Sequence, residues 1–411
     1  MKYFVVIPDG AGDQPRPELD NKTPLEAAST PNMDSLAQSG RVGLTNHVPK
    51  GYSPGSEVAC MSLMGYDPTV YFTGRAPLEA AAKNINLEPN DWAIRCNLVT
   101  ISTEHGVEVM EDFTADHITT EESETLLAAA QEGLAKHFPD LVGWTFTPGV
   151  SYRNLLLYRG PNDLASLLGT DLTTTPPHDL MDKPIENSFP KGTGGDLLKD
   201  IMSCSTQWLT NHPINQQRRR EGKRPATHVW LWGVGRAPTM EPFIEKYGIN
   251  GTMITAVDLL RGLASLAGWK RQEVPGATGY LDTDYMAKGR YAIQEFSNAD
   301  LVCVHVEAPD EASHEGNTSA KVTSLEEIDA KIVGPVWDYL RSRGDYRILI
   351  CPDHPTFIAT KTHSHGPVPF IMAGSDVTSS SHTSYCEASA ALTGDVIQEG
   401  WQLIGEFLRK G

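Results

Sequence analysis

The sequence predicts an α/β protein built on a mainly parallel β-sheet. Short, continuously apolar and β-branched runs recur along the chain, which is typical of strands buried on both faces, and helical patterns separate them. Of the 411 residues, 40% are apolar and 21% are charged, as in ordinary globular proteins. A single core rarely grows past roughly 250–300 residues, so we expect one large domain with an insertion, or two domains.

Five apolar runs are the expected strands of this sheet: Tyr3–Ile7, Val229–Leu231, Leu301–Val306, Tyr346–Cys351 and Pro369–Met372. Between them, Asp258–Leu266 has apolar residues at helical spacing, and Ser324–Leu340 is predicted to form a longer amphipathic helix with Ser324 as its N-cap. Alternating strands and helices indicate an α/β core.

The stretch from about Asp112 to Asp171 has a different pattern. Residues 118–134 have a helical pattern with a polar start. Two runs in which apolar and polar residues alternate follow, at 144–150 and 152–160, and then a connection rich in Pro, Thr and Gly. We therefore predict a main domain in two parts, residues 1–112 and 173–411. A small inserted α+β domain, residues 113–172, is expected to act as a lid or substrate domain.

Charge and cysteine content narrow the class of partner. The formal net charge of −18 argues against a nucleic-acid or anionic-membrane partner, because both require a basic face. No run approaches the roughly 18 apolar residues of a membrane span.

Six scattered cysteines without a C-x-x-C pair predict free thiols and a cytoplasmic location. The basic run at 218–224 is either a solvated helix end or a source of phosphate-binding cations.

Acidic and imidazole side chains follow three of the expected strands. Asp9 follows the first strand, Asp310 and His314 follow the run at 301–306, and Asp353 and His354 follow the run at 346–351. The carboxyl ends of parallel strands meet at one sheet edge, where the ligand crevice of open α/β sheets lies. Carboxylates gathered there repel one another unless a cation neutralises them. Mixed Asp and His ligands suit Mn²⁺ or Zn²⁺ better than Ca²⁺.

Ser56 is a candidate nucleophile. It follows Pro54-Gly55 and precedes an apolar helical run that begins at Val58, so its hydroxyl and the free N–H groups of a helix start could face an anion. An N-cap serine would explain the same pattern equally well. A metal ion bonded to the hydroxyl would lower its pKa and make it a usable nucleophile.

Several motifs follow one another in a fixed order along nearly the whole chain: PDGAGD, PGSEVA with GYDP, GRAPLEAA, HVEAPDEASHEG, PDHP and HSHGPVPF. In these motifs the chain resembles a known family, the archaeal-type cofactor-independent phosphoglycerate mutases of the alkaline phosphatase superfamily. It implies an alkaline-phosphatase-like α/β core with a mainly parallel sheet and a smaller inserted domain. It also implies two divalent cations, which are Mn²⁺, Zn²⁺ or Mg²⁺.

The resemblance also implies the residues that bind these ions. The ligands of one metal would be Asp9, Ser56, Asp353 and His354, with Ser56 transiently phosphorylated. Those of the other metal would be Asp310, His314 and His363. At this last position Ser364 replaces the usual threonine, and His365 competes with His363 for the ligand role.

The sequence identifies the basic residues that would bind the substrate less clearly than it identifies the metal ligands. Four basic residues are candidates, and each is equally suited to a structural ion pair: Arg75, Arg95, Arg153 and Lys321. His178 and Asp179 lie in the predicted connection between domains, and we hypothesise that one of them relays the proton of the substrate hydroxyl.

Four functions remain open. The sequence predicts no oligomeric state for the protein. The leading function transfers a phosphoryl group between the 2- and 3-hydroxyls of glycerate through phospho-Ser56, with a small phosphorylated substrate as the partner. The second is a homoserine kinase-like phosphotransferase of the same family, to which the motifs HITTEE, CNLVTI and WLWGVG look closer. The third is a metal-dependent phosphatase, and the fourth is a metal-binding interaction protein without activity.

Overall fold

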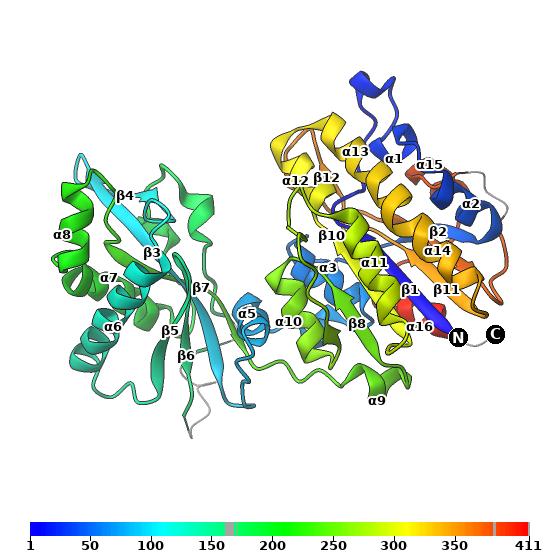
Figure 1. Ribbon diagram of the computed structural model, residues 1–411. Coiled ribbons are helices and arrows are strands. Elements are labelled where there is room, and N and C mark those ends of the chain that lie inside the picture. The colour runs from blue at the N-terminus through cyan, green and yellow to red at the C-terminus, as the bar shows by residue number, and fades with distance from the viewer. Residues whose placement is uncertain (161–167, 170, 381–383, 410–411) are drawn as a thin grey trace. The chain divides into compact units, whose positions relative to one another are not determined.

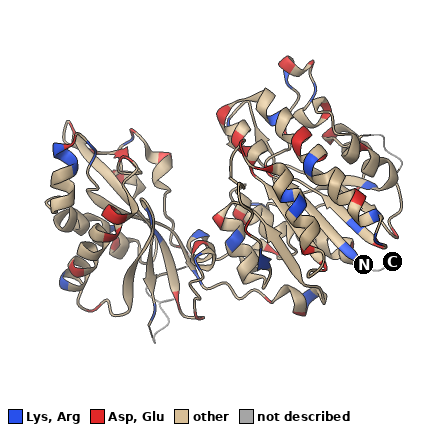
Figure 2. Ribbon diagram, in the orientation of Figure 1, with Lys and Arg blue, Asp and Glu red and all other residues tan. Residues whose placement is uncertain are grey.

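The computed structural model describes residues 1–160, 168–169, 171–380 and 384–409. The chain divides into two compact units (Figure 1). Unit 1 comprises residues 1–72 and 240–411, and unit 2 comprises Thr73–Thr239. The chain therefore passes from one unit to the other twice. Acidic and basic residues are interspersed over the elements of both units (Figure 2).

Unit 1 is built on an eight-stranded sheet with the strand order β15-β2-β14-β11-β1-β10-β8-β9. Only β14 runs antiparallel to its neighbours β11 and β2, so the sheet is mainly parallel, as predicted. The strands are β1 (Lys2–Pro8), β2 (Arg41–Thr45), β8 (Gly251–Ile254), β9 (Lys270–Arg271), β10 (Leu301–Val306), β11 (Tyr346–Ile350), β14 (Val368–Gly374) and β15 (Val396–Ile397). Four of the five predicted runs, those of β1, β10, β11 and β14, are strands of this sheet.

Helices cover both faces of this sheet. Side chains at alternate positions of β1, such as Phe4 and Val6, pack against α2, α11, α13 and α14, whereas Tyr3 packs on Phe407 of α16. The helices of unit 1 are α1 (Pro24–Ala27), α2 (Pro31–Ser39), α3 (Ser56–Leu63), α4 (Pro68–Tyr71), α9 (Phe243–Tyr247), α10 (Asp258–Leu266), α11 (Tyr285–Glu295), α12 (Ala308–Glu315), α13 (Thr318–Ile328), α14 (Gly334–Arg341), α15 (Glu387–Leu392) and α16 (Leu403–Leu408). A short hairpin of β12 (Thr356–Phe357) and β13 (Thr362–His363) lies after β11.

One predicted helix start is wrong. The predicted helix Asp258–Leu266 coincides with α10, but the helix predicted to begin at Ser324 begins at Thr318. Asn317 caps it by accepting a hydrogen bond from the Ala320 N–H at 3.1 Å. Its first turn carries few apolar residues, so the amphipathic pattern starts late. A π-helical turn, Asp329–Val333, then joins α13 to α14.

Unit 2 is a five-stranded antiparallel sheet in which β3 pairs with β4, β6 and β7, and β5 pairs with β6. Helices α6 and α7 cover one face, and α5 packs on Ala93, Leu155 and Leu157 of the other. The elements are α5 (Arg75–Ala82), β3 (Trp92–Glu104), β4 (Val107–Asp112), α6 (Thr120–His137), β5 (Trp144–Val150), β6 (Arg153–Tyr158), α7 (Gly195–Leu209), α8 (Pro213–Arg220) and β7 (His228–Arg236).

The predicted domain boundaries differ from those of the structure. Unit 2 extends well beyond the predicted insertion at 113–172 on both sides, because its central strand β3 precedes that segment and its partner β7 follows it. The run Val229–Leu231, predicted in the main sheet, lies in β7. Although β7 is paired with β3 alone, Val229, Trp230 and Leu231 are all buried, so the run has the continuous apolar composition of a parallel strand.

Two further sequence predictions concern the whole chain. All six cysteines are free, and five of them are buried, as expected. Within the described ranges, no helix combines the length and the apolar character needed to cross a membrane.

Candidate active site

The candidate site lies at the carboxyl edge of the unit 1 sheet. Strands β11, β1 and β10 are adjacent and parallel, so their ends meet at one edge. Asp9 directly follows β1, and Asp353 lies in the loop after β11. Helix α12 follows β10 and places Asp310 one turn before His314, on the same helix face. The predicted convergence of the three carboxylates is therefore confirmed.

The first group of side chains surrounds the ring of His354. Its Nε2 atom lies 3.6 Å from Asp9 Oδ1, 3.4 Å from Asp353 Oδ2 and 3.1 Å from Ser56 Oγ. Asp9, Asp353 and His354 are all buried and offer ligand atoms within 4.8 Å of one another. Together with Ser56, these are the residues that the family resemblance implies as ligands of one metal ion.

The second group adjoins the first. His314 Nε2 lies 3.1 Å from Asp310 Oδ2 and 3.0 Å from His363 Nε2, and His363 Nε2 lies 3.5 Å from Asp310 Oδ2. His363 belongs to β13, whereas His365, the competing candidate, is exposed. The structure thus brings the first candidate, and not the second, beside Asp310.

The electrostatics of both groups fit divalent cations. Burial raises the pKa of Asp9 well above its usual value, and the neighbouring carboxylates of Asp353 and Asp310 raise it further. Its Oδ1 atom is buried and accepts no hydrogen bond from the part of the chain that the structure describes. Burial also acts to raise the pKa of Asp310, but hydrogen bonds from His314 and His363 hold it well below its usual value. A cation would satisfy the orphaned oxygen and relieve the repulsion.

Ser56 is the first residue of α3, and Gly55 occupies the N-cap position. The alternative that Ser56 is an N-cap is therefore wrong, because its hydroxyl bonds to His354 instead. At this position the positive end of the helix dipole adds to the field that an anion would meet.

His305 was not found from the sequence, because it lies inside the apolar run of β10. Its Nε2 atom bonds Asp9 Oδ2 at 2.9 Å, and its Nδ1 atom bonds the Thr255 hydroxyl at 3.1 Å. Burial lowers the pKa of His305 to about 3 and keeps the ring neutral. With both nitrogens engaged, His305 orients Asp9. Glu307 also lies near Asp9, and burial raises its pKa to about 8.

Lys321, predicted as a substrate-binding cation, is completely buried. Its Nζ atom lies 2.8 Å from Asp13 Oδ2 and 2.8 Å from the Thr356 carbonyl oxygen. Burial lowers its pKa, but the ion pair with Asp13 opposes that effect. The prediction is therefore corrected to a structural role, because a substrate cannot reach an ammonium group with no exposed surface.

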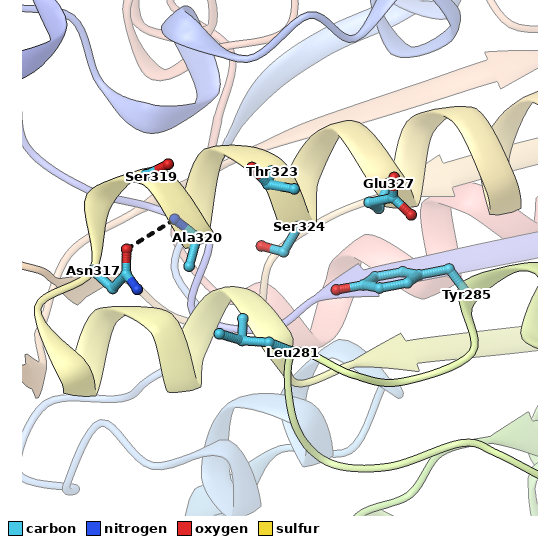
Figure 3. A pocket seen from close by; sticks show the side chains of 8 residues that line it. All are labelled: Leu281, Tyr285, Asn317, Ser319, Ala320, Thr323, Ser324 and Glu327. Carbon is cyan, nitrogen blue, oxygen red and sulfur yellow. Dashed lines mark hydrogen bonds between the residues drawn. The ribbon is translucent and has the colours of Figure 1, made fainter.

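A separate cavity of about 370 Å³ lies along α13 (Figure 3). Its lining includes Tyr285, Thr323 and Glu327 and contains neither Lys321 nor any of the predicted metal ligands. The candidate site is thus distinct from this cavity.

Unit 2 gathers two of the predicted arginines around one indole ring. The Arg95 guanidinium lies 3.8 Å from the ring centroid of Trp232, and that of Arg75 lies 5.7 Å from it. Arg95 also forms an ion pair with Glu79 at 3.0 Å. The His178 ring contacts the same indole edge to face, with centroids 5.5 Å apart.

The remaining predicted residues of unit 2 are more exposed. Arg153 is exposed and lies over the ring of Tyr152, and it pairs with Asn97 across β6 and β3. Asp179 is exposed, with its Oδ1 atom 3.9 Å from His178 Nε2. Burial lowers the pKa of His178, and the Asp179 carboxylate opposes that effect.

The basic run at 218–224 is mainly structural. Arg218 is buried and donates hydrogen bonds to Glu122 and to the Ala115 carbonyl oxygen, both at 2.6 Å. Arg224 forms an ion pair with Glu111 at 3.0 Å. These contacts favour the helix-end interpretation over phosphate binding.

The fold and the site define an α/β protein with a mainly parallel sheet and a carboxylate and imidazole centre suited to divalent cations. A model of the 2,3-bisphosphoglycerate-independent phosphoglycerate mutase family matches residues 37–215. A relative of that name from Methanothrix thermoacetophila is 46% identical over 98% of both chains. A probable 2,3-bisphosphoglycerate-independent phosphoglycerate mutase from Geobacter sulfurreducens is 43% identical over 99% of this chain and 100% of its own. The chain belongs to this family of phosphoglycerate mutases.

Solved structures agree with this placement. A protein of Pyrococcus horikoshii superposes with a TM-score of 0.78 at 26% identity and covers 100% of this chain and 99% of its own. A cofactor-independent phosphoglycerate mutase from Thermoplasma acidophilum superposes with a TM-score of 0.66 at 25% identity, with 99% of both chains covered. The predicted fold class is therefore confirmed.

Proposed function

We propose that the protein interconverts 2- and 3-phosphoglycerate through a phosphoserine at Ser56, beside two divalent cations. The observation that carries the proposal is the position of the Ser56 hydroxyl, 3.1 Å from His354 Nε2 and within the group formed by Asp9 and Asp353. Relatives that carry the mutase name over nearly the whole chain support the same activity.

Seven side chains would hold the two cations. One ion would be bound by Asp9, Asp353, His354 and Ser56, and the other by Asp310, His314 and His363. Bound there, Mn²⁺, Zn²⁺ or Mg²⁺ would offset the charge of the phosphoryl oxygens and lower the pKa of the serine hydroxyl. The mixture of imidazole and carboxylate ligands favours Mn²⁺ or Zn²⁺.

The phosphoryl group is transferred in two steps, first to Ser56 and then back to glycerate. Ser56 Oγ attacks phosphorus and loses its proton, the bond between phosphorus and one glycerate oxygen breaks, and that oxygen gains a proton. Glycerate then turns, its other hydroxyl attacks the phosphoserine, and Ser56 Oγ leaves and is protonated again. The substrate and product thus differ only in which hydroxyl carries the phosphoryl group.

Residues of unit 2 are proposed to bind and orient the substrate. Arg75, Arg95 and Arg153 supply guanidinium groups, which match the planar geometry of a carboxylate or phosphate. One of Asp179 and His178, whose side chains lie 3.9 Å apart, is proposed to relay the proton of the glycerate hydroxyl. If neither residue has this role, the Asp179→Asn and His178→Gln variants will both turn over at the unchanged rate.

Unit 2 as a whole is proposed to be the substrate domain, in place of the narrower segment 113–172. A phosphoenzyme open to water would lose its phosphoryl group by hydrolysis, so a mutase must shield the intermediate while glycerate turns. A phosphatase has no such need. This requirement accounts for a second unit that carries its own cationic groups.

One paired assay separates the proposed function from its alternatives. The protein is given 3-phosphoglycerate with Mn²⁺ and, in parallel, homoserine with ATP. Formation of 2-phosphoglycerate without free phosphate supports the mutase. Phosphohomoserine would instead indicate the kinase-like branch, free phosphate alone a phosphatase, and no product an interaction protein. We propose the cytoplasm as the site of this reaction, in keeping with the free thiols.

A further inference from the structure

A buried hydroxyl joins the two proposed ligand groups. Thr356 has no exposed surface, and its Oγ1 atom lies 2.5 Å from Asp310 Oδ1 and 3.2 Å from His354 Nδ1. Asp310 belongs to one group and His354 to the other. We infer that Thr356 is a positioning residue that orients one ligand of each cation through this single hydroxyl. The inference rests on the proposed two-cation function and adds a residue that the function does not assign.

The direction of the two hydrogen bonds follows from the number of protons available. A threonine hydroxyl carries one proton, and an ionised carboxylate only accepts. The Thr356 hydroxyl therefore donates to Asp310, and its lone pair accepts from His354 Nδ1–H. This fixes the tautomer of His354: Nδ1 is protonated and Nε2 is bare. The bare nitrogen is the one that faces Asp9, Asp353 and Ser56.

The same hydroxyl divides the two oxygens of Asp310 between two tasks. Oδ1 accepts from Thr356, whereas Oδ2 faces His314 at 3.1 Å and His363 at 3.5 Å. Each of the two ligands held by Thr356 thus has one atom fixed by the hydroxyl and a second atom directed into its own group. Outer hydrogen bonds of this kind orient ligands before a metal binds.

The backbone of Thr356 is held as firmly as its side chain. Its N–H donates to the Gly12 carbonyl at 3.1 Å, and its carbonyl accepts from Lys321 Nζ at 2.8 Å. Across the β12–β13 hairpin it pairs directly with His363, a third proposed ligand. The buried ion pair of Lys321 with Asp13 therefore acts on the ligand groups through Thr356.

The hydrogen bond between Thr356 and Asp310 is tightly packed on the side of Gly10. Gly10 has a positive φ of 61°, and a side chain there would place its Cβ 2.6 Å from Thr356 Oγ1 and closer still to Asp310 Oδ1. Glycine at this position leaves room for the hydrogen bond between Thr356 and Asp310.

Three variants separate the hydroxyl from the rest of the side chain. Thr356→Val keeps the branched shape and removes the hydroxyl, whereas Thr356→Ser keeps the hydroxyl and removes the methyl group. Thr362→Val is the matched control, because it makes the same change in the same hairpin, where the hydroxyl bonds Thr360 at 3.0 Å. Mn²⁺ stoichiometry and affinity are measured by titration of each protein.

We expect Thr356→Val to weaken Mn²⁺ binding by about 10- to 100-fold, the range typical of lost outer hydrogen bonds to metal ligands. Thr356→Ser should stay within about threefold of the unmodified protein, and Thr362→Val should not change the affinity. Unchanged affinity in Thr356→Val would overturn the inference. Equal losses in Thr356→Val and Thr356→Ser would also overturn it, because they would assign the effect to packing of the methyl group.

A second measurement needs neither a variant nor a metal. Nitrogen-15 NMR of the histidine-labelled, metal-free protein at neutral to mildly basic pH should show His354 protonated at Nδ1. Protonation at Nε2 instead would overturn the inference even if Thr356→Val does not fold. If the unmodified protein binds no pair of Mn²⁺ ions, the proposed function fails, and the tautomer still decides the role of Thr356.

Discussion

Replacing Ser56 with Ala removes a single oxygen atom from the candidate site and is expected to abolish phosphoryl transfer. The lost hydroxyl makes a partly buried hydrogen bond to His354 at 3.1 Å, and such a bond contributes only about 1 kcal/mol to stability. The fold should therefore survive. The second ligand group, around Asp310, does not include Ser56 and should still bind its ion.

The loss of activity should be far larger than the loss of stability. Without Oγ there is no atom to accept the phosphoryl group, and removal of a nucleophile costs roughly 10⁴-fold or more in turnover. The matched control is Ser62→Ala on the same helix α3, where the hydroxyl lies 3.4 Å from His47 Nδ1 and outside both ligand groups. This variant should retain activity.

The assay measures 2-phosphoglycerate formed from 3-phosphoglycerate, together with mass spectrometry of acid-quenched enzyme for a phosphorylated Ser56 peptide. The unmodified enzyme and Ser62→Ala should both show the peptide. Turnover by Ser56→Ala above about 1% of the normal rate would refute the reasoning, because transfer would then be direct.

Three further predictions test other parts of the site. Asp310→Asn, which replaces a carboxylate shared by two histidines with a neutral amide, should lower bound Mn²⁺ from two ions to one by metal analysis; two ions at unchanged affinity would contradict the second group. Arg95→Met should raise KM for 3-phosphoglycerate about 10-fold or more, whereas Arg224→Met, which breaks an ion pair elsewhere in unit 2, should leave KM unchanged; equal KM values for both would argue against Arg95 as a substrate cation. Burial lowers the pKa of His228 from 6.5 to about 4, so the unfolded chain binds the extra proton, and stability is lost as pH falls from about 6.5 to 4, by up to about 3 kcal/mol. His228→Gln should flatten this part of the stability curve in urea unfolding, and an unchanged slope would show that His228 does not cause it.

The sequence by itself determined the elements whose signal is local. Buried strands such as β1 and β10 appear as apolar runs, and α10 has the bounds that its periodicity predicts. The acidic residues after β1, β10 and β11 could be placed together because parallel strands end at the same edge. The resemblance to a family then pointed to His363 as a ligand but left His365 as a competitor, and only the structure places His363 beside Asp310.

Only the tertiary structure decided which distant segments pair. β3 and β7 are more than a hundred residues apart in the chain, and their pairing moves the boundary of unit 2 to residues 73 and 239. Apolar composition shows that a strand is covered and does not show what covers it, so β7 could not be separated from the main sheet.

The sequence also could not show which polar side chains are buried. In the sequence, Lys321 cannot be told from a lysine that binds substrate. Only its buried ion pair with Asp13 shows that it is structural. His305 lies inside an apolar run, and Thr356 lies two residues after His354 with no spacing that marks it as a residue that orients ligands. Their roles arise from hydrogen bonds to Asp9 and Asp310, residues about 300 and 46 positions away, and a contact of this range exists only once the chain is folded.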